Sequence, residues 1–168
     1  GEKANWEKFA LWDQTSRVPL FIHAPGVSKD GETTRQPATL TDVYPTLCEL
    51  ADLPIPSQCD GLSLVSQLKN PGAKRDRLAL CSFQFGNERN PSHGVADERY
   101  RFIRYGNGFE ELYDIQNDPH EYENLIDNPQ FASVKTRLAN GIPENSATLA
   151  ILPRESPHHR ANQKKRGE

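Results

Sequence analysis

Apolar positions in residues 1–70 predict helices around one buried strand. Trp6, Phe9 and Ala10 recur at helical spacing and predict a helix over residues 5–13. The run from Val18 to Ala24 is apolar at nearly every position. Such continuous runs are typical of a strand buried on both faces of an α/β sheet. We therefore expect this strand to need neighbouring strands, with His23 as a buried core histidine.

A second helix is predicted to begin at Asp42, which is a favoured residue at a helix N-terminus. Pro45 is tolerated in its first turn, where a missing N–H costs little. Four apolar residues recur with helical periodicity and predict one buried stripe. They are Val43, Leu47, Leu50 and Ala51. Residues 62–68 predict one or two further helical turns.

The pattern changes to strands beyond residue 70. Residues 70–77 are rich in proline, glycine and charge, which indicates a boundary between subdomains. Residues 78–83 predict one strand. Residues 100–105 and 110–115 predict a hairpin, because Gly106-Asn107-Gly108 between them tolerates positive φ.

Two helices are predicted after the hairpin. Asp118, Pro119 and Glu121 have the spacing of a capping box and a first-turn proline. Asn128-Pro129 predicts the start of a last helix that ends near Gly141. Its inward residues would be Phe131, Val134 and Leu138.

These elements together predict an α/β fold class followed by a small α+β subdomain. Residues 1–70 would form the end of a larger α/β domain, and residues 71–142 a small subdomain built on an antiparallel sheet. Residues 143–168 lack periodicity and predict a disordered, basic tail.

Composition limits the classes of function. The 168 residues contain 20 Lys+Arg and 23 Asp+Glu, a net charge of −3, which argues against a general nucleic-acid binder. No run approaches the roughly 18 apolar residues of a transmembrane helix. The hydrophobic fraction of 35% is low for a free-standing domain. The chain also lacks methionine and opens at Gly1, so we expect the C-terminal part of a longer polypeptide. Processing of a complete protein is the alternative.

Cysteines and histidines offer few candidate sites. Cys48, Cys59 and Cys81 have no metal-like spacing. A Cys48–Cys59 bridge is conceivable, and free thiols are the favoured interpretation. The sequence has no Gly-rich phosphate loop, Gly-x-Ser-x-Gly, Cys-x-x-Cys or His-Glu-x-x-His motif, so no metal ligands are predicted. His93 lies in a predicted Gly/Asn/Pro-rich loop between strands, where binding residues concentrate.

Seven spans, in the same order along the chain, resemble type I sulfatases of the alkaline phosphatase superfamily, most closely the iduronate-2-sulfatase branch. They are residues 1–9, 15–20, 40–47, 60–64, 97–105, 111–115 and 118–125. The first span is similar to the stretch that follows the metal-binding Asp-His-Gly motif of that family. The resemblance covers residues 1–140.

This resemblance implies a sulfatase that hydrolyses sulfate esters on a carbohydrate. The family uses a formylglycine nucleophile, made from Cys or Ser in a Cys/Ser-x-Pro-x-Arg motif, and a Ca²⁺ held mainly by aspartates. Neither the motif nor the paired aspartates of the family's N-terminal strand occur in this sequence. The resemblance therefore implies that nucleophile and metal ligands belong to a missing N-terminal region, and that the chain alone is inactive. A periplasmic or extracellular location is expected for the family.

The resemblance also assigns two site residues. Lys8, two positions after Trp6, matches the lysine that contacts the substrate sulfate, and a compact ammonium suits a tetrahedral anion. From the residues alone, Lys8 would be an ordinary surface lysine. His93 lies near a substrate-facing pair of the small subdomain, and Ala96 stands where the family often has arginine. Lys3 is left unassigned.

Two other classes of function remain open from sequence. The parent could be a phosphate or phosphonate ester hydrolase of the same superfamily. Alternatively, the chain could be a non-catalytic glycan-binding or interaction module that displays the His93 loop. The basic tail could contact a sulfated polysaccharide, but a solvated segment is the favoured interpretation.

Overall fold

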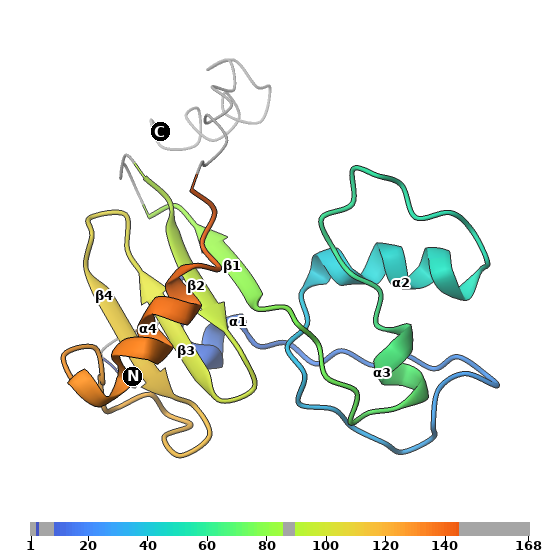
Figure 1. The fold of residues 1–168 in the computed structure, drawn as a ribbon, viewed down its shortest axis with the longest axis horizontal. Helices are drawn as coiled ribbons and strands as arrows, with labels where there is room; N and C mark the ends of the chain where they lie inside the picture. The colour runs from blue at the N-terminus through green and yellow to red at the C-terminus, as the bar shows by residue number, and fades with distance from the viewer. Residues whose placement is uncertain (1–2, 4–8, 86–89, 145–168) are drawn as a thin grey trace, which may run out of the picture.

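The computed structural model describes residues 3, 9–85 and 90–144. Figure 1 shows a sheet with helix α4 at one side of the molecule and helices α2 and α3 at the other. The helices before the sheet are α1 (Asp13–Ser16), η2 (Leu40–Asp42), α2 (Val43–Leu50) and α3 (Val65–Lys69). The sheet and the helices after it are β1 (Ala79–Phe83), β2 (Ser92–Ala96), β3 (Tyr100–Arg104), β4 (Glu110–Asp114), η3 (Pro129–Phe131) and α4 (Ala132–Ala139). In the described part of the chain, no helix is long and apolar enough to cross a membrane.

The four strands form one antiparallel sheet in the order β1-β2-β3-β4. The predicted antiparallel sheet is confirmed, as are the strand at β1 and the β3–β4 hairpin. Gly108 has φ +88°, which is the conformation that the turn requires. The prediction that His93 lies in a loop is wrong, because His93 is the second residue of β2. The strand is specified by pairing with β1 and β3 on both sides rather than by its own sequence.

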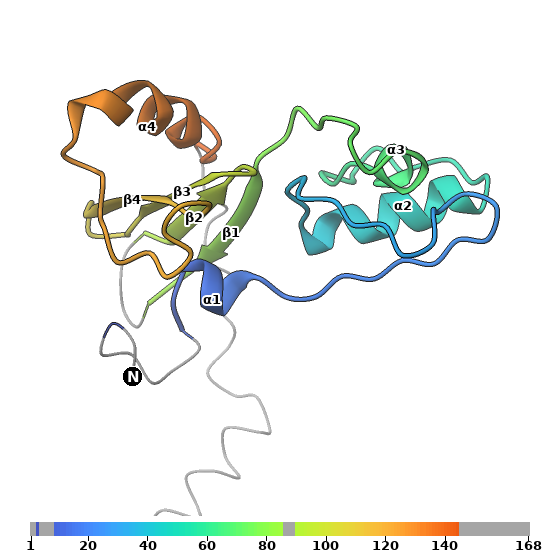
Figure 2. The same cartoon turned by 90° about the horizontal axis from the view of Figure 1, so that it is seen from below.

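One face of the sheet packs against α4, as Figure 2 shows. Val95, Phe102, Leu112 and Leu138 form the buried cluster between them. Leu138 comes from α4, so the predicted last helix and its inward leucine are confirmed. Asn128 is the N-cap of η3, the short helix that leads into α4. Its side chain accepts a hydrogen bond from the Gln130 N–H at 3.0 Å.

The opposite face of the sheet is covered by the N-terminal segment. Figure 2 shows α1 on the side of the sheet away from α4. Leu11, Ile103 and Tyr113 form a second buried cluster there. Gly94 permits this approach, since a Cβ at that position would lie 3.2 Å from the Leu11 carbonyl oxygen. The predicted helix over residues 5–13 is wrong for residues 9–12, which are not helical, and residues 5–8 lie outside the described residues.

Helix α2 forms where predicted but buries a different face. Pro45, Thr46 and Cys48 are buried, whereas Leu47 is exposed. Thr46 explains the difference: its Oγ1 donates to the Asp42 carbonyl and accepts from the Leu64 N–H. These bonds turn the Thr46 side of α2 toward the segment before α3. The predicted stripe is therefore wrong at Leu47, and also at Ala51, which is exposed.

The predicted buried strand over residues 18–24 does not form. The segment has no sheet pairing, and Phe21 is 91% exposed. No described strand lies beside it to satisfy its backbone, so it crosses the molecule as an extended chain. His23 is exposed rather than buried, with its Nδ1 3.7 Å from Asp30 Oδ1.

The predicted helix at Asp118–Glu121 is also absent. Glu121 has φ +56°, outside the helical region, and its side chain is buried. Its carboxylate accepts from the Asp13 N–H, 108 residues away, instead of closing a local capping box. A tertiary partner thus replaces the local one. All three cysteines are free: Cys48 is buried, Cys59 half-buried and Cys81 exposed.

Asp42 is a buried carboxylate that connects α2 to the segment leading into the sheet. It accepts from the N–H groups of Thr39 and Leu62, each at 2.9 Å, and from Arg75 Nη1 at 3.1 Å. Burial raises the pKa of Asp42, but these hydrogen bonds outweigh burial and hold the pKa below its ordinary value. The carboxylate therefore stabilises the fold in its charged form.

We expect Asp42→Asn to lower the free energy of unfolding by about 2–3 kcal/mol at pH 7, because charge-assisted hydrogen bonds are lost. A depressed folded pKa gives stability that is present above the ordinary value of 3.8 and is lost as the pH falls through the folded pKa. The difference between the two proteins should therefore shrink below that pH. Urea denaturation at pH 7 and pH 3, followed by circular dichroism, measures both effects. Asp30→Asn, at an exposed site, is the control; an equal loss there would contradict the assignment.

Candidate functional site

His93 is held within the sheet on the face that packs against α4. It lies opposite Ser82 on β1 and Arg104 on β3, and it is 8% exposed. Its Nδ1 is 2.8 Å from Ser82 Oγ. Burial lowers the pKa of His93, and the positive charge of Arg104 lowers it further. The imidazole is therefore neutral at pH 7, so it offers a hydrogen-bonding group and not a cation for a sulfate.

Charged side chains continue the row from His93 across the sheet. Arg104 Nε donates to Glu110 Oε1 at 2.8 Å, and Lys135 Nζ of α4 lies 2.7 Å from Glu110 Oε2. Burial raises the pKa of Glu110, but the bonds from Lys135 and Arg104 bring it below its ordinary value. Because Glu110 satisfies both cations, this row is a closed ion-pair network and offers an anion little free charge.

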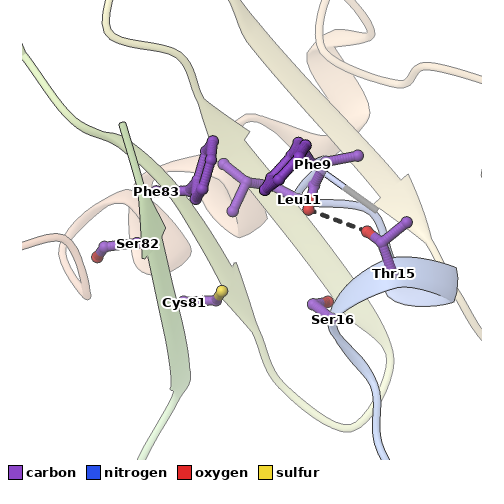
Figure 3. A pocket seen from close by; sticks show the side chains of 8 residues that line it. Phe9, Leu11, Thr15, Ser16, Cys81, Ser82 and Phe83 are labelled. Carbon is purple, nitrogen blue, oxygen red and sulfur yellow. Dashed lines mark hydrogen bonds between the residues drawn. The ribbon is translucent and has the colours of Figure 1, made fainter. Parts of the chain in front are cut away.

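Lys8 lies outside the described residues, so its predicted contact with sulfate and its distance from His93 stay predictions. The residues just after it, Phe9 to Leu11, border a hollow of about 200 Å³ on the other face of the sheet. Figure 3 shows the Phe9 ring beside that of Phe83, with their centroids 5.3 Å apart. The residues that line the hollow are Phe9, Ala10, Leu11, Thr15, Ser16, Cys81, Ser82 and Phe83.

A buried charge cluster lies on this same face, where the N-terminal segment meets the sheet. Arg101 of β3 donates through Nη1 to the Leu11 carbonyl at 3.0 Å and through Nη2 to Asp13 Oδ1 at 2.8 Å. Its Nε is 3.5 Å from Glu121 Oε1. Glu121 Oε2 in turn accepts from the Asp13 N–H at 2.8 Å. Burial raises the pKa of Glu121 to about 7, against the opposing charge of Arg101.

Two further contacts extend this cluster. Trp12 Nε1 donates to Glu111 Oε2 of β4 at 2.9 Å. The Lys3 ammonium lies 4.5 Å from the centroid of the Trp12 ring and 4.2 Å from that of Tyr113, a cation–π geometry. Burial lowers the pKa of Lys3, although Glu121 and Glu111 counteract it.

Sequence patterns alone did not find this cluster. Glu121 fitted a local capping box, and Arg101 was one of several charges along a strand. The available signal was the position of Arg101, which shares the inward face of β3 with Ile103 and so places a charge where an apolar residue is expected. Its partners Leu11 and Asp13 are 90 and 88 residues away along the chain, so no local pattern could name them.

The described residues do not fit a calcium site. They contain no group of three or more His, Cys, Asp or Glu side chains placed to hold a metal ion. Three buried carboxylates are instead paired with arginine: Asp13 and Glu121 with Arg101, and Asp42 with Arg75.

Comparison with known proteins identifies the family. The model for the C-terminal region of N-sulphoglucosamine sulphohydrolase matches residues 1–148, so the chain belongs to this sulfatase family. Its members are sulfatases, that is, sulfuric ester hydrolases. The resemblance to type I sulfatases is confirmed, while the iduronate-2-sulfatase branch stays a prediction.

Curated relatives agree with this family. A sulfatase of Formosa agariphila is 33% identical over 148 residues, which cover 88% of this chain and 28% of that protein. A Delta 4,5-hexuronate-2-O-sulfatase of Bacteroides thetaiotaomicron is 30% identical over 132 residues, covering 74% of this chain and 27% of that protein. The chain thus spans between a quarter and a third of the length of these relatives.

Solved structures confirm the fold class. A phosphonate monoester hydrolase from Silicibacter pomeroyi superposes with a TM-score of 0.54 at 23% identity, over 70% of this chain and 26% of the other. A protein in complex with its substrate D-glucosamine-2-N,6-O-disulfate gives 0.51 at 23% identity, over 59% of this chain and 22% of the other. The described part of the chain therefore has the fold of the C-terminal region of α/β sulfatases.

Proposed function

We propose that this chain is the C-terminal part of a sulfatase that hydrolyses sulfate esters on a carbohydrate and is iduronate-2-sulfatase-like. The observation that carries the proposal is the family match over residues 1–148. The proposed substrate class is supported by relatives named as an ulvan-active sulfatase and a hexuronate-2-O-sulfatase. The formylglycine nucleophile and a divalent metal, proposed to be Ca²⁺, would come from residues outside this chain.

The surface of the helical part supports a larger assembly. In residues 40–62, six large apolar side chains are at least 44% exposed, a surface that a monomeric domain usually covers. They are Leu40, Tyr44, Leu47, Leu53, Ile55 and Leu62. In the proposal, this surface packs against the region that carries the nucleophile.

The chain would contribute substrate-binding groups. Lys8 is proposed to bind the sulfate and to stabilise the negative charge that develops as the ester bond breaks. His93 is proposed as a substrate contact of the small subdomain. Its neutral imidazole suits a sugar hydroxyl better than it suits the sulfate itself.

We expect the 168-residue chain to show no turnover of 4-nitrophenyl sulfate with added Ca²⁺, because it lacks the nucleophile motif. The same chain joined to the region encoded immediately upstream should hydrolyse it. Release of 4-nitrophenol measures both, and circular dichroism verifies that the chain is folded. Turnover by the isolated chain at the rate of the joined protein would overturn the proposal.

A phosphonate ester hydrolase is the second candidate, since a phosphonate monoester hydrolase shares the fold. The family match favours the sulfatase. The ratio of kcat/KM for a sulfate monoester to that for a phosphonate monoester in the joined protein distinguishes the two, and a ratio below one would favour the second candidate.

A further inference from the structure

The imidazole ring of His93 is covered by the protein except near one nitrogen. His93 belongs to the inner strand β2, with β1 and β3 on either side, and it is only 8% exposed. Its Nδ1 lies 2.8 Å from Ser82 Oγ, and Ser82 is its only hydrogen-bond partner among the described residues. Within the same residues, Nε2 has no partner and is not fully buried, so it keeps contact with solvent. The ring therefore presents a single polar atom at the surface.

Ser82 is placed to hold this ring in one orientation. It lies directly opposite His93 in the register of β1 and β2. Figure 3 shows the Ser82 side chain on the other side of β1 from those of Cys81 and Phe83, so it shares the α4 face of the sheet with His93. The two backbones are fixed by the strand pairing, and a serine has few rotamers. The bond to Nδ1 therefore determines which nitrogen of the ring faces outward.

The charges around the ring bear on which atom of this pair donates. Arg104 lies opposite His93 on β3, and Glu110 and Lys135 continue the row. Burial, and then the charge of Arg104, lower the pKa of His93, so at pH 7 the ring is neutral and one of its nitrogens carries no hydrogen. A neutral histidine in water favours the tautomer with its hydrogen on Nε2. A serine hydroxyl that donates to the bare Nδ1 reinforces this tautomer, because the bond at one nitrogen sets the state of the other.

We infer that Ser82 is a positioning residue: its hydroxyl donates to Nδ1 and holds His93 in the tautomer with hydrogen on Nε2, so that His93 meets the carbohydrate as a hydrogen-bond donor. This inference rests on the proposed function of His93 as a substrate contact. A fixed donor selects an acceptor on the substrate, which for a carbohydrate is a hydroxyl, ring or carboxylate oxygen. Ser82 thereby takes part in substrate recognition through His93.

Nuclear magnetic resonance of protein labelled at histidine tests the tautomer directly. Long-range proton–nitrogen correlations distinguish a ring nitrogen that carries hydrogen from a bare one, and His93→Asn identifies the His93 signals among those of the five histidines. At pH 7 we expect the hydrogen of His93 on Nε2, and a measurable share of the other tautomer in Ser82→Ala. A hydrogen on Nδ1 in the unsubstituted protein, or the same tautomer population in Ser82→Ala, would overturn the inference. The joined protein replaces the 168-residue chain if circular dichroism shows that the chain alone is unfolded.

Kinetics in the joined protein test the consequence for the substrate. We expect Ser82→Ala to lower kcat/KM for 4-methylumbelliferyl iduronide 2-sulfate about 3- to 10-fold, the effect of about one hydrogen bond. For 4-nitrophenyl sulfate, which has no sugar, the change should stay below about twofold. Ser82→Thr keeps the hydroxyl and should retain most of the activity on the sugar ester. Ser66→Ala, the same substitution at an exposed position of α3, is the matched control.

A double-mutant cycle between Ser82 and His93 separates a positioning role from a merely structural one. His93→Asn keeps a polar atom near Nδ1 but lacks Nε2, and in this background Ser82→Ala should change kcat/KM for the sugar ester less than about twofold. Equal losses in both backgrounds, or equal losses on both esters, would contradict the positioning role.

Failure of the proposed function gives a different result. If His93→Asn leaves kcat/KM for the sugar ester unchanged, the proposed substrate contact of His93 fails, and the part of Ser82 in recognition fails with it, whatever the tautomer. A joined protein that turns over only 4-nitrophenyl sulfate would refute the iduronate-2-sulfatase-like substrate. In that case, the tautomer of His93 decides whether Ser82 positions the ring.

Discussion

In the proposed sulfatase that contains this chain, replacing Lys8 by alanine is expected to lower kcat/KM for a sulfate monoester by about 10²–10³-fold. Negative charge grows on the oxygens around the breaking S–O bond. A preorganised cation beside those oxygens stabilises the transition state more than the ground state, so its loss falls largely on kcat. Steady-state kinetics with 4-nitrophenyl sulfate measure the change.

Two comparisons make the Lys8 result specific. Lys8→Arg keeps a positive charge and should recover part of the activity, although a planar guanidinium fits a site built for an ammonium poorly. Lys29→Ala removes an exposed lysine from a surface loop and should leave kcat/KM unchanged. A loss after Lys8→Ala that appears only in KM would contradict a role in the transition state and indicate ground-state binding alone.

Replacing Phe102 by alanine is expected to lower the free energy of unfolding of the small subdomain by about 3–5 kcal/mol. Phe102 is fully buried at the centre of the cluster with Val95, Leu112 and Leu138. Removal of the ring loses the free energy gained from its burial, and it leaves a cavity that β2, β4 and α4 cannot close. Because whole domains are stable by only about 5–15 kcal/mol, this single change removes a large share.

Urea denaturation followed by circular dichroism measures the Phe102 effect. Phe21→Ala is the matched control, because the same atoms are removed from a side chain that is 91% exposed, and the expected loss is below about 0.5 kcal/mol. Phe102→Leu should fall between the two. Similar losses at Phe21 and Phe102 would show that the cluster under α4 is not the core of the subdomain.

The sequence correctly predicted the elements whose turn or cap residues are adjacent to them in the chain. The hairpin of β3 and β4 depends on Gly106-Asn107-Gly108, and the last helix on Asn128 and Pro129; both formed as expected. Strand β2 was missed, because His93 and Gly94 have little strand propensity. The strand is stabilised by its pairing with β1 and β3. The boundary predicted near residue 70 stays a prediction.

Predictions that relied on a single local pattern were wrong where tertiary contacts determine the structure. Residues 18–24 have the composition of a buried strand, yet the described chain provides no neighbour for them. Glu121 has the spacing of a capping box, yet Asp13 is its partner. Leu47 matches a helical stripe, yet the hydrogen bonds of Thr46 turn the other side of α2 inward. In each case the outcome depends on a contact outside the local sequence, or on the lack of a neighbouring strand among the described residues.

The candidate site was predictable only in part, for the same reason. Lys8 and His93 came from resemblance to sulfatases, and their roles stay predictions. His93 was predicted to lie in a loop between two strands, whereas it lies in strand β2. Arg101 could not be recognised, because its role depends on Leu11 and Asp13, about 90 residues away, meeting it on the sheet.

The way the N-terminal segment covers the sheet has a consequence for the order of assembly. The strands pair with their neighbours in sequence, so the sheet and α4 close only short loops and can form early. Residues 11–13 leave the ribosome long before Arg101 and Glu121, and their partners do not exist until nearly the whole described chain has been made. We therefore expect this segment to dock only after β3, β4 and Glu121 have been made. Until then, the face of the sheet that Ile103 and Tyr113 line would stay open, and the docking of Leu11 would close it.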